Sequence, residues 1–240
     1  MEPLFRLGNW AVFPYTVLMD LGILAGLALF LWLARREVGL EEALDVALCS
    51  MAGGILVGRA VYVLANLEYF SERWADALRV WKGGVAFSGA LLGGVVACFL
   101  YARFKDLRLD ALLDAAAPAL ALGQVFGWLA CHVSGRAYGR MGVAFPRLFL
   151  PDIYGMKAYR FPVQLTAALW SGLVLALLLW MLIRPRRNGR LFLVYVLLYL
   201  PVDFLLRFLR GDVTPVMGPL EWGQLVEAMV FIGALMRMKR

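Results

Sequence analysis

Charged residues are scarce in this chain of 240 residues: Asp, Glu, Lys and Arg make up 17% of it, against about 25% in a typical soluble domain. Hydrophobic residues make up 62%, and the mean hydropathy is +0.75. This composition excludes an ordinary soluble enzyme and a disordered tail. It predicts a helical protein that crosses a membrane several times.

Residues that bind metals or form disulfides are also few. His132 is the single histidine, and the three cysteines lie in separate apolar stretches, so neither a metal cluster nor a disulfide framework is predicted. No Walker loop is present, and no dinucleotide fingerprint follows a strand. The formal net charge is +7, yet no basic stripe interleaved with aromatic residues indicates nucleic-acid binding. We therefore expect no metal, no cofactor and no nucleic-acid partner.

Seven stretches are apolar enough to cross a bilayer as helices, which takes about 20 residues each. They are 12–34, 44–66, 85–102, 111–134, 162–183, 191–209 and 221–237. The fold class predicted for residues 1–240 is therefore a single all-α integral membrane domain with seven transmembrane helices. The two longer connections, about 67–84 and 135–161, are expected to lie at the membrane interface as amphipathic helices or re-entrant segments.

Basic residues between these stretches predict the orientation of the chain. The short segments after the first, third, fifth and seventh stretches are rich in Lys and Arg. On the other side, the basic residues fall mostly in the two longer connections and are mixed with acids. Because positive charge in short loops favours the cytoplasmic side, we expect the N-terminus outside and the C-terminus in the cytoplasm.

Ionisable residues inside a membrane span are costly, so each is a candidate for function. The candidates are Asp20, Asp45, Arg59, Asp114, Asp203, Arg207 and Glu227. Asp203 and Arg207 are four residues apart on one helical face, which predicts a structural ion pair. Arg59 has no acid at helical spacing, which predicts a partner from another helix or a phosphate group.

A glycine-rich stretch at the edge of the third predicted span also points to a site. Gly83 and Gly84 are followed by Ser88 and Gly89. This pattern is typical of an opened helix end that can line a cavity for a lipid headgroup. A Ser88–His132 dyad across two helices is a further hypothesis, since neighbouring residues of one helix do not face each other.

Together, these segments resemble the prolipoprotein diacylglyceryl transferase family of bacterial inner membranes. The matching pieces are 53–63, 81–94, 123–140 with its Tyr138-Gly139-Arg140 ending, 142–146, Pro162, 164–165, 208–212 and 223–224. They extend from about Tyr15 to Gln224. The resemblance implies a seven-span fold. It also implies transfer of the diacylglyceryl group of phosphatidylglycerol to the cysteine thiol of a prolipoprotein, with glycerol phosphate as the leaving group.

Several positions that carry the family's chemistry hold other residue types here. Ser88 stands where the family has a histidine, Trp128 where it has an arginine, and Cys131 where it has an asparagine. Asp203 and Arg207 stand where the family has an arginine and a glutamate, so the polarity of the pair is reversed. An aspartate in place of an arginine repels phosphate, and a serine is not a base near neutral pH.

The leading hypothesis is a divergent member that binds an anionic, phosphatidylglycerol-like lipid and transfers a lipid-derived group to a membrane-associated acceptor. One alternative is a non-catalytic lipid-binding or assembly partner; another is the standard transfer to a lipoprotein precursor. The sequence leaves open whether the protein is an enzyme. The candidate catalytic residues are Ser88 and Cys131. The candidate substrate-binding residues are Tyr15, Arg59, Gly83, Gly84, Gly89, Gly139, Arg140, Gln164, Asp203, Arg207 and Arg210.

Overall fold

The computed structural model describes residues 3–7, 10–142, 145–183, 190–212 and 220–238. Within these ranges the chain is mostly helical. It divides into two compact units. Unit 1 consists of Met1–Phe30 and Leu113–Arg240, and unit 2 consists of Leu31–Leu112.

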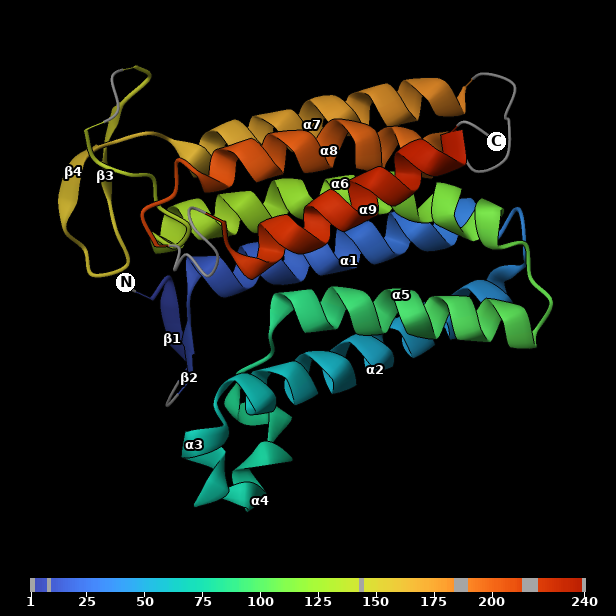
Figure 1. Cartoon of the computed structure of the whole chain (residues 1–240), viewed down its shortest axis with the longest axis horizontal. Coiled ribbons are helices and arrows are strands. Elements are labelled where there is room, and N and C mark those ends of the chain that lie inside the picture. The colour runs from blue at the N-terminus through green and yellow to red at the C-terminus, as the bar shows by residue number, and fades with distance from the viewer. Residues whose placement is uncertain (1–2, 8–9, 143–144, 184–189, 213–219, 239–240) are drawn as a thin grey trace. The chain divides into compact units, whose positions relative to one another are not determined.

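Unit 1 contains five long helices or most of their length (Figure 1): α1 (Pro14–Ala34), α6 (Leu109–Ser134), α7 (Val163–Leu182), α8 (Arg190–Arg207) and α9 (Trp222–Met238). α8 packs against both α7 and α9. The buried apolar core comes from α6, α7, α8 and α9, and its members are Ala117, Ala121, Val174, Leu178, Leu191, Tyr195, Val196, Tyr199 and Ala234.

Polar groups join the helices of unit 1 as well. Asp114 of α6 accepts a hydrogen bond from the backbone N–H of Phe192, at 3.1 Å, in the first turn of α8. An acceptor at this position satisfies one of the unpaired N–H groups of a helix N-terminus. The indole Nε1–H of Trp128 in α6 donates to the hydroxyl of Tyr199 in α8 over 3.1 Å. Asp114 therefore supports the start of α8.

Two antiparallel hairpins depart from the all-helical prediction. β1 (Phe5–Leu7) pairs with β2 (Trp10–Val12), and β3 (Leu148–Pro151) pairs with β4 (Lys157–Arg160). The second hairpin lies in the 135–161 connection, where helices or re-entrant segments are expected from the sequence. Its turn is set by Asp152, whose Oδ1 accepts two backbone N–H groups at 2.9 Å, those of the residues two and four positions later. Such side-chain-to-backbone bonds favour a turn over a helix.

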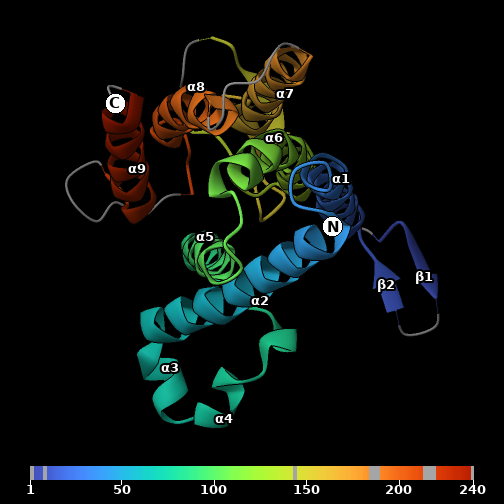
Figure 2. The same ribbon diagram turned by 90° about the vertical axis from the view of Figure 1, so that its right-hand side faces the viewer.

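Unit 2 is built on α2 (Leu40–Ala65) and α5 (Phe87–Phe104), which pack closely along their length. Figure 2 shows this pair, with the short helices of the connection at one end. These are α3 (Leu67–Ser71), α4 (Trp74–Ala77) and the 3₁₀ turn η1 (Val80–Lys82). Helices in the 67–84 connection are as predicted, and their location at a membrane interface stays a prediction.

Glycines allow α2 and α5 to approach each other. A Cβ on Gly53 would lie 2.7 Å from the carbonyl oxygen of Gly93. A Cβ on Gly93 would overlap the carbonyl oxygen of Gly53 and lie 2.6 Å from Cβ of Val57. Small residues at such a contact are typical of helix pairs in membranes.

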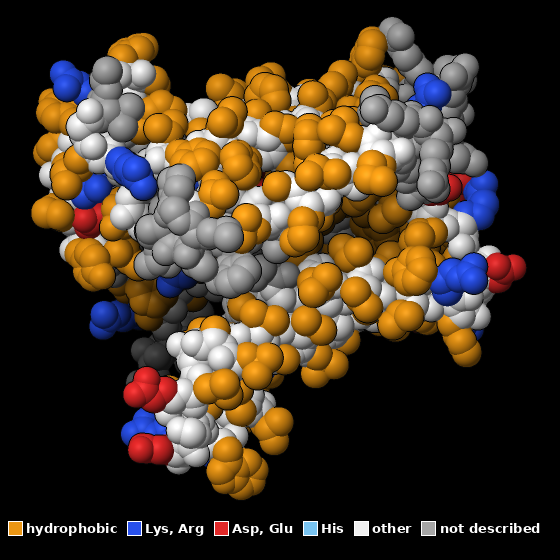
Figure 3. Space-filling view, viewed as in Figure 1, with side chains coloured by type: hydrophobic (Ala, Val, Ile, Leu, Met, Phe, Trp, Pro, Cys, Tyr) orange, Lys and Arg blue, Asp and Glu red, His pale blue; other side chains and the backbone are white. Residues whose placement is uncertain are grey.

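Four described helices are long and apolar enough to cross a membrane: α1, α2, α6 and α7. Shorter apolar stretches run over Gly89–Phe104 and Gly223–Met236. Hydrophobic side chains cover much of the visible helix surfaces, whereas Lys and Arg gather near helix ends (Figure 3). Each of the seven predicted stretches contains a helix, and the count of seven membrane spans stays a prediction.

We expect Gly93→Ala to destabilise the protein, because the added methyl group would overlap α2. Overpacking of this kind typically costs about 1–3 kcal/mol. Gly233→Ala is the matched control, since a Cβ there meets nothing within 4 Å among the described atoms. Thermal unfolding in detergent should show a lower melting temperature for the first variant only. An equal melting temperature for both variants would contradict the close α2–α5 contact.

Candidate functional site

Three backbone segments of unit 1 pair side by side near the ends of α6 and α8. They are 138–141 after α6, 209–211 after α8, and 160–161 at the end of β4. Arg140 lies in the first segment, and its backbone N–H donates to a carbonyl of the second over 2.7 Å. Arg210 lies in the second and pairs with the residue before Arg140. The backbone thus fixes two arginines next to each other.

Arg136, Arg140 and Arg210 form what we term the arginine cluster. Arg140 Nε donates to the carbonyl of Arg210 over 2.8 Å. Arg210 Nε and Nη2 donate to the carboxylate of Asp212 over 3.0 and 3.1 Å. The guanidinium of Arg136 lies over the ring of Tyr15, 4.9 Å from its centroid. Three guanidinium groups and one carboxylate leave a net charge of +2, and the Arg136 and Arg140 residues are exposed.

Cys131 and Gln164 border the arginine cluster. The backbone N–H of Arg136 donates to the carbonyl of Cys131 over 3.1 Å, and the Cys131 thiol interacts electrostatically with Arg136 and Arg210. Gln164 is 2% exposed and donates from Nε2 to the carbonyl of Arg136 over 2.9 Å. Position 139 requires glycine, because a Cβ there would overlap a backbone carbonyl of the third segment.

A buried ion pair supports the paired segments. Arg160 Nη2 lies 2.9 Å from Asp152 Oδ2, and both side chains are 3% exposed. The guanidinium of Arg160 also lies 4.7 Å from the centroid of the Tyr138 ring. Asp152 is not among the residues predicted from the sequence. An aspartate three residues before Gly155, a combination typical of a turn, could have drawn attention to it.

Asp203 and Arg207 form the ion pair predicted from the sequence, with Nε 3.1 Å from Oδ2. Arg207 has two further carboxylate partners, Glu221 at 2.8 Å and Glu227 at 2.7 Å. Gly223 makes room for them, since a Cβ there would lie 2.5 Å from Arg207 Nη1. Glu221, at the edge of the last predicted span, is not among the residues predicted from the sequence. The three carboxylates outnumber the single guanidinium, so this group of residues does not attract phosphate.

Arg59 lies in unit 2, is 7% exposed and is bound to backbone. Its Nε donates to the carbonyl of Ala77 over 2.8 Å, and Nη2 donates to that of Asp76 over 2.5 Å. Its Nη1 donates to the carbonyls of Gly83 and Gly84 over 2.6 and 2.8 Å. A guanidinium has five N–H donors. Two of the four carbonyl acceptors belong to α4, which is a partner from another helix, as the sequence predicts; a phosphate contact of Arg59 stays a prediction.

The glycines of this stretch have structural contacts of their own. Gly83 and Gly84 have positive φ angles of 84° and 81°, which favour glycine. A Cβ on Gly84 would overlap the ring of Tyr62. A Cβ on Gly89 would lie 2.9 Å from the Cα of Gly58. These contacts position the connection and the start of α5.

The candidate residues fall in both units. Ser88 is in α5, but its side chain lies outside the described part of the structure, and so the predicted Ser88–His132 dyad stays a prediction. Unit 2 also contains Arg59, Gly83, Gly84 and Gly89. Unit 1 contains Tyr15, Cys131, Gly139, Arg140, Gln164, Asp203, Arg207 and Arg210. Among these candidates, the one arginine described as exposed is Arg140, in unit 1.

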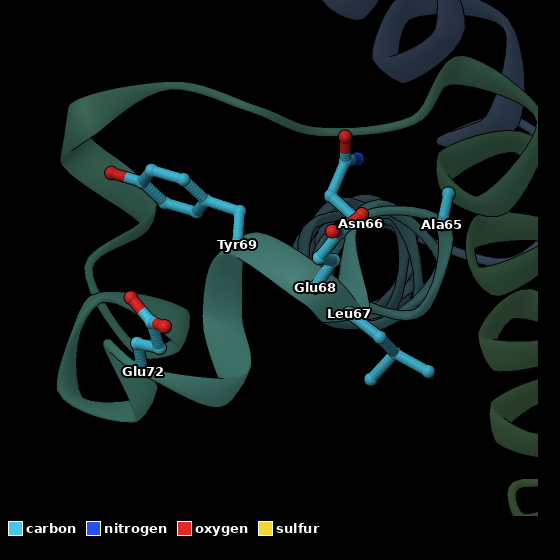
Figure 4. Close-up of a pocket in the computed structure, with 6 residues that line it drawn as sticks. All are labelled: Ala65, Asn66, Leu67, Glu68, Tyr69 and Glu72. Atoms are coloured by element: carbon cyan, nitrogen blue, oxygen red, sulfur yellow. The ribbon is translucent and has the colours of Figure 1, made fainter.

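A cavity of about 520 Å³ lies at the junction of α2 and α3 in unit 2 (Figure 4). It is lined by Ala65, Asn66, Leu67, Glu68, Tyr69 and Glu72. Two of these side chains are carboxylates and none is a cation. This cavity therefore does not suit an anionic headgroup, in contrast to the arginine cluster.

Comparison with known proteins matches residues 2–239 to the prolipoprotein diacylglyceryl transferase family. A relative from Gloeobacter violaceus is 35% identical, over 96% of this chain and 89% of that protein. One from Bacillus licheniformis is 34% identical, over 88% and 83%. Both are named phosphatidylglycerol–prolipoprotein diacylglyceryl transferase. With nearly its whole length matched, this membrane protein belongs to the prolipoprotein diacylglyceryl transferase family.

Proposed function

We propose that the protein binds the headgroup of an anionic phospholipid at the arginine cluster and transfers its diacylglyceryl group to an acceptor thiol in the membrane. The observation that carries this proposal is the arginine cluster itself, in which Arg136, Arg140 and Arg210 together with Asp212 have a net positive charge. Guanidinium groups bind phosphate with paired, charge-assisted hydrogen bonds. The relatives are named for phosphatidylglycerol and prolipoprotein as substrates, which supports this choice of lipid and acceptor.

The proposed step is a substitution at the glycerol carbon that carries the phosphate. The acceptor sulfur forms a bond to this carbon as the carbon–oxygen bond to phosphate breaks. The electron pair leaves with glycerol phosphate, and the thiol proton is lost to a base. The guanidinium groups of Arg140 and Arg210 would stabilise the phosphate charge of the leaving group. Cys131 would line the reacting end, and Ser88 stays a proposed catalytic residue of unit 2.

A second candidate function is a lipid-binding partner without transfer activity. The observation that favours it is the environment of Arg207. Its guanidinium forms ion pairs with Asp203, Glu221 and Glu227 and is therefore not available to a phosphate. The resemblance implies an arginine and a glutamate at positions 203 and 207, and the reversed pair adds no cation for phosphate. Under this alternative the arginine cluster retains the lipid, but no group is transferred.

We further propose the topology that the sequence predicts. The chain would form one seven-span domain in the bacterial inner membrane, with the N-terminus outside and the C-terminus in the cytoplasm. The four apolar helices that meet the length and composition of a span support the membrane location. Reagents that label introduced cysteines from one side of the membrane would test the orientation of both termini.

A transfer assay separates the two candidate functions. Purified protein in phosphatidylglycerol vesicles is incubated with a lipobox peptide, and the peptide is weighed by mass spectrometry. We expect a gain of one diacylglyceryl group, with glycerol phosphate released in equal amount. If the mass of the peptide is unchanged while phosphatidylglycerol stays bound to the protein, the transfer function is wrong. The second candidate function, a lipid-binding partner without transfer activity, would then hold.

Arg140→Gln should weaken retention of phosphatidylglycerol, because it removes a cation from the arginine cluster. A hydrogen bond to a charged group contributes about 1.5–3 kcal/mol, so a loss of roughly tenfold or more in affinity is expected. The matched control is Arg108→Gln in unit 2, an exposed arginine paired with Glu37. Native mass spectrometry of both variants measures retention, and equal retention would contradict the proposed headgroup site.

Arg59→Gln should loosen the 76–84 connection and leave phosphatidylglycerol retention within about twofold of wild type. The variant loses a buried guanidinium that holds four carbonyls, and breaking such contacts typically costs several kcal/mol. Limited proteolysis should cut the connection faster. Lost retention with unchanged proteolysis would instead assign Arg59 to phosphate, as the sequence predicts.

A further inference from the structure

Three carboxylates surround one guanidinium where α8 meets the start of α9, both in unit 1. They belong to Asp203, Glu221 and Glu227, and the guanidinium belongs to Arg207; we call this group the α8–α9 carboxylate cluster. Arg207 lies within 3.1 Å of all three. Asp203 is 7% exposed and Glu227 is 9% exposed. With all four groups ionised, three negative charges and one positive charge would leave a net charge of −2 among apolar helices.

Glu227 uses only one of its two carboxylate oxygens. Oε1 lies 2.7 Å from Arg207 Nε. Oε2 is buried and has no hydrogen-bond donor in the described part of the chain. An ionised carboxylate can only accept hydrogen bonds, and a buried acceptor without a donor is costly. Because no donor reaches Oε2, this oxygen is the position in the cluster where a bound proton would remove the cost.

The carboxyl groups of Glu227 and Asp203 meet at one atom: Glu227 Oε1 lies 2.7 Å and Asp203 Oδ2 lies 3.1 Å from Arg207 Nε. Two ionised carboxylates cannot hydrogen-bond, because neither has a proton to donate. In the described part of the chain, the other titratable groups that face this pair are Tyr195, Tyr199 and Arg207 from α8 and Glu221 from the segment before α9. Among these, Arg207 is the one cation, and it is already shared by three carboxylates.

We infer that Glu227 and Asp203 share a proton, which Glu227 Oε2 holds and donates to Asp203. Two carboxylates at one buried site commonly hold one proton between them, since like charges so close cannot both persist. The α8–α9 pair then contains a proton-binding site, which the proposed lipid chemistry does not require. A proton fits better than a metal ion, because no described group of three or more His, Cys, Asp or Glu residues is arranged to hold one.

Infrared spectroscopy of the full-length protein in lipid vesicles tests the inference. A protonated carboxyl group has a carbonyl stretching band separate from the bands of carboxylates. At neutral pH we expect this band in the wild-type protein and its loss in Glu227→Gln. Asp203→Asn should also lose it, because Glu227 can then ionise against Arg207. The band of the wild-type protein should disappear reversibly at alkaline pH.

Glu221→Gln is the matched control within the cluster. It makes the same chemical change at a carboxylate that lies 2.8 Å from Arg207 Nη1, away from the proposed proton, so the band should persist. Glu227→Gln should melt no lower than the wild-type protein, since the amide has the shape of a protonated acid. No band in the wild type, or a band that persists in Glu227→Gln, would overturn the inference. A band that sodium ions abolish at constant pH would assign the site to a cation instead.

Discussion

A guanidinium group among apolar helices must find an acceptor for its N–H groups, because no water is there to solvate it. This constraint governs the arginines of both units. In unit 2, Arg59 meets it with four backbone carbonyls, so the connection after α2 has to close over the guanidinium. In unit 1, Arg160 meets it with Asp152, and Arg207 meets it with three carboxylates.

The arginine cluster differs from these buried arginines in what remains available to a ligand. Arg136 and Arg140 are exposed, and the paired segments hold Arg140 and Arg210 together through backbone hydrogen bonds. A site fixed by backbone costs little further ordering when an anion binds, which favours recognition. Buried arginines thus build the fold, and the exposed Arg136 and Arg140 are available to the lipid headgroup that we propose.

Hydropathy predicts the long helices well, since each of the seven apolar stretches contains a helix. The four-residue spacing of Asp203 and Arg207 likewise predicts their ion pair. Other features depend on contacts that the local sequence does not show. The partners of Arg59 are carbonyls, which every residue has, so a search for acids could not find them. The β3–β4 hairpin depends on Asp152, whose side chain binds both the turn and Arg160.

We propose that the headgroup of an anionic phospholipid binds at the arginine cluster rather than beside Arg59. A phosphatidylglycerol analogue with a photoreactive headgroup tests it most directly, with the labelled residues located by mass spectrometry after illumination in vesicles. We expect labels in 131–140 and 209–212, competed by unmodified phosphatidylglycerol and weakened in Arg140→Gln. Labels confined to 59–84, unchanged in that variant, would place the headgroup beside Arg59 and contradict binding at the arginine cluster.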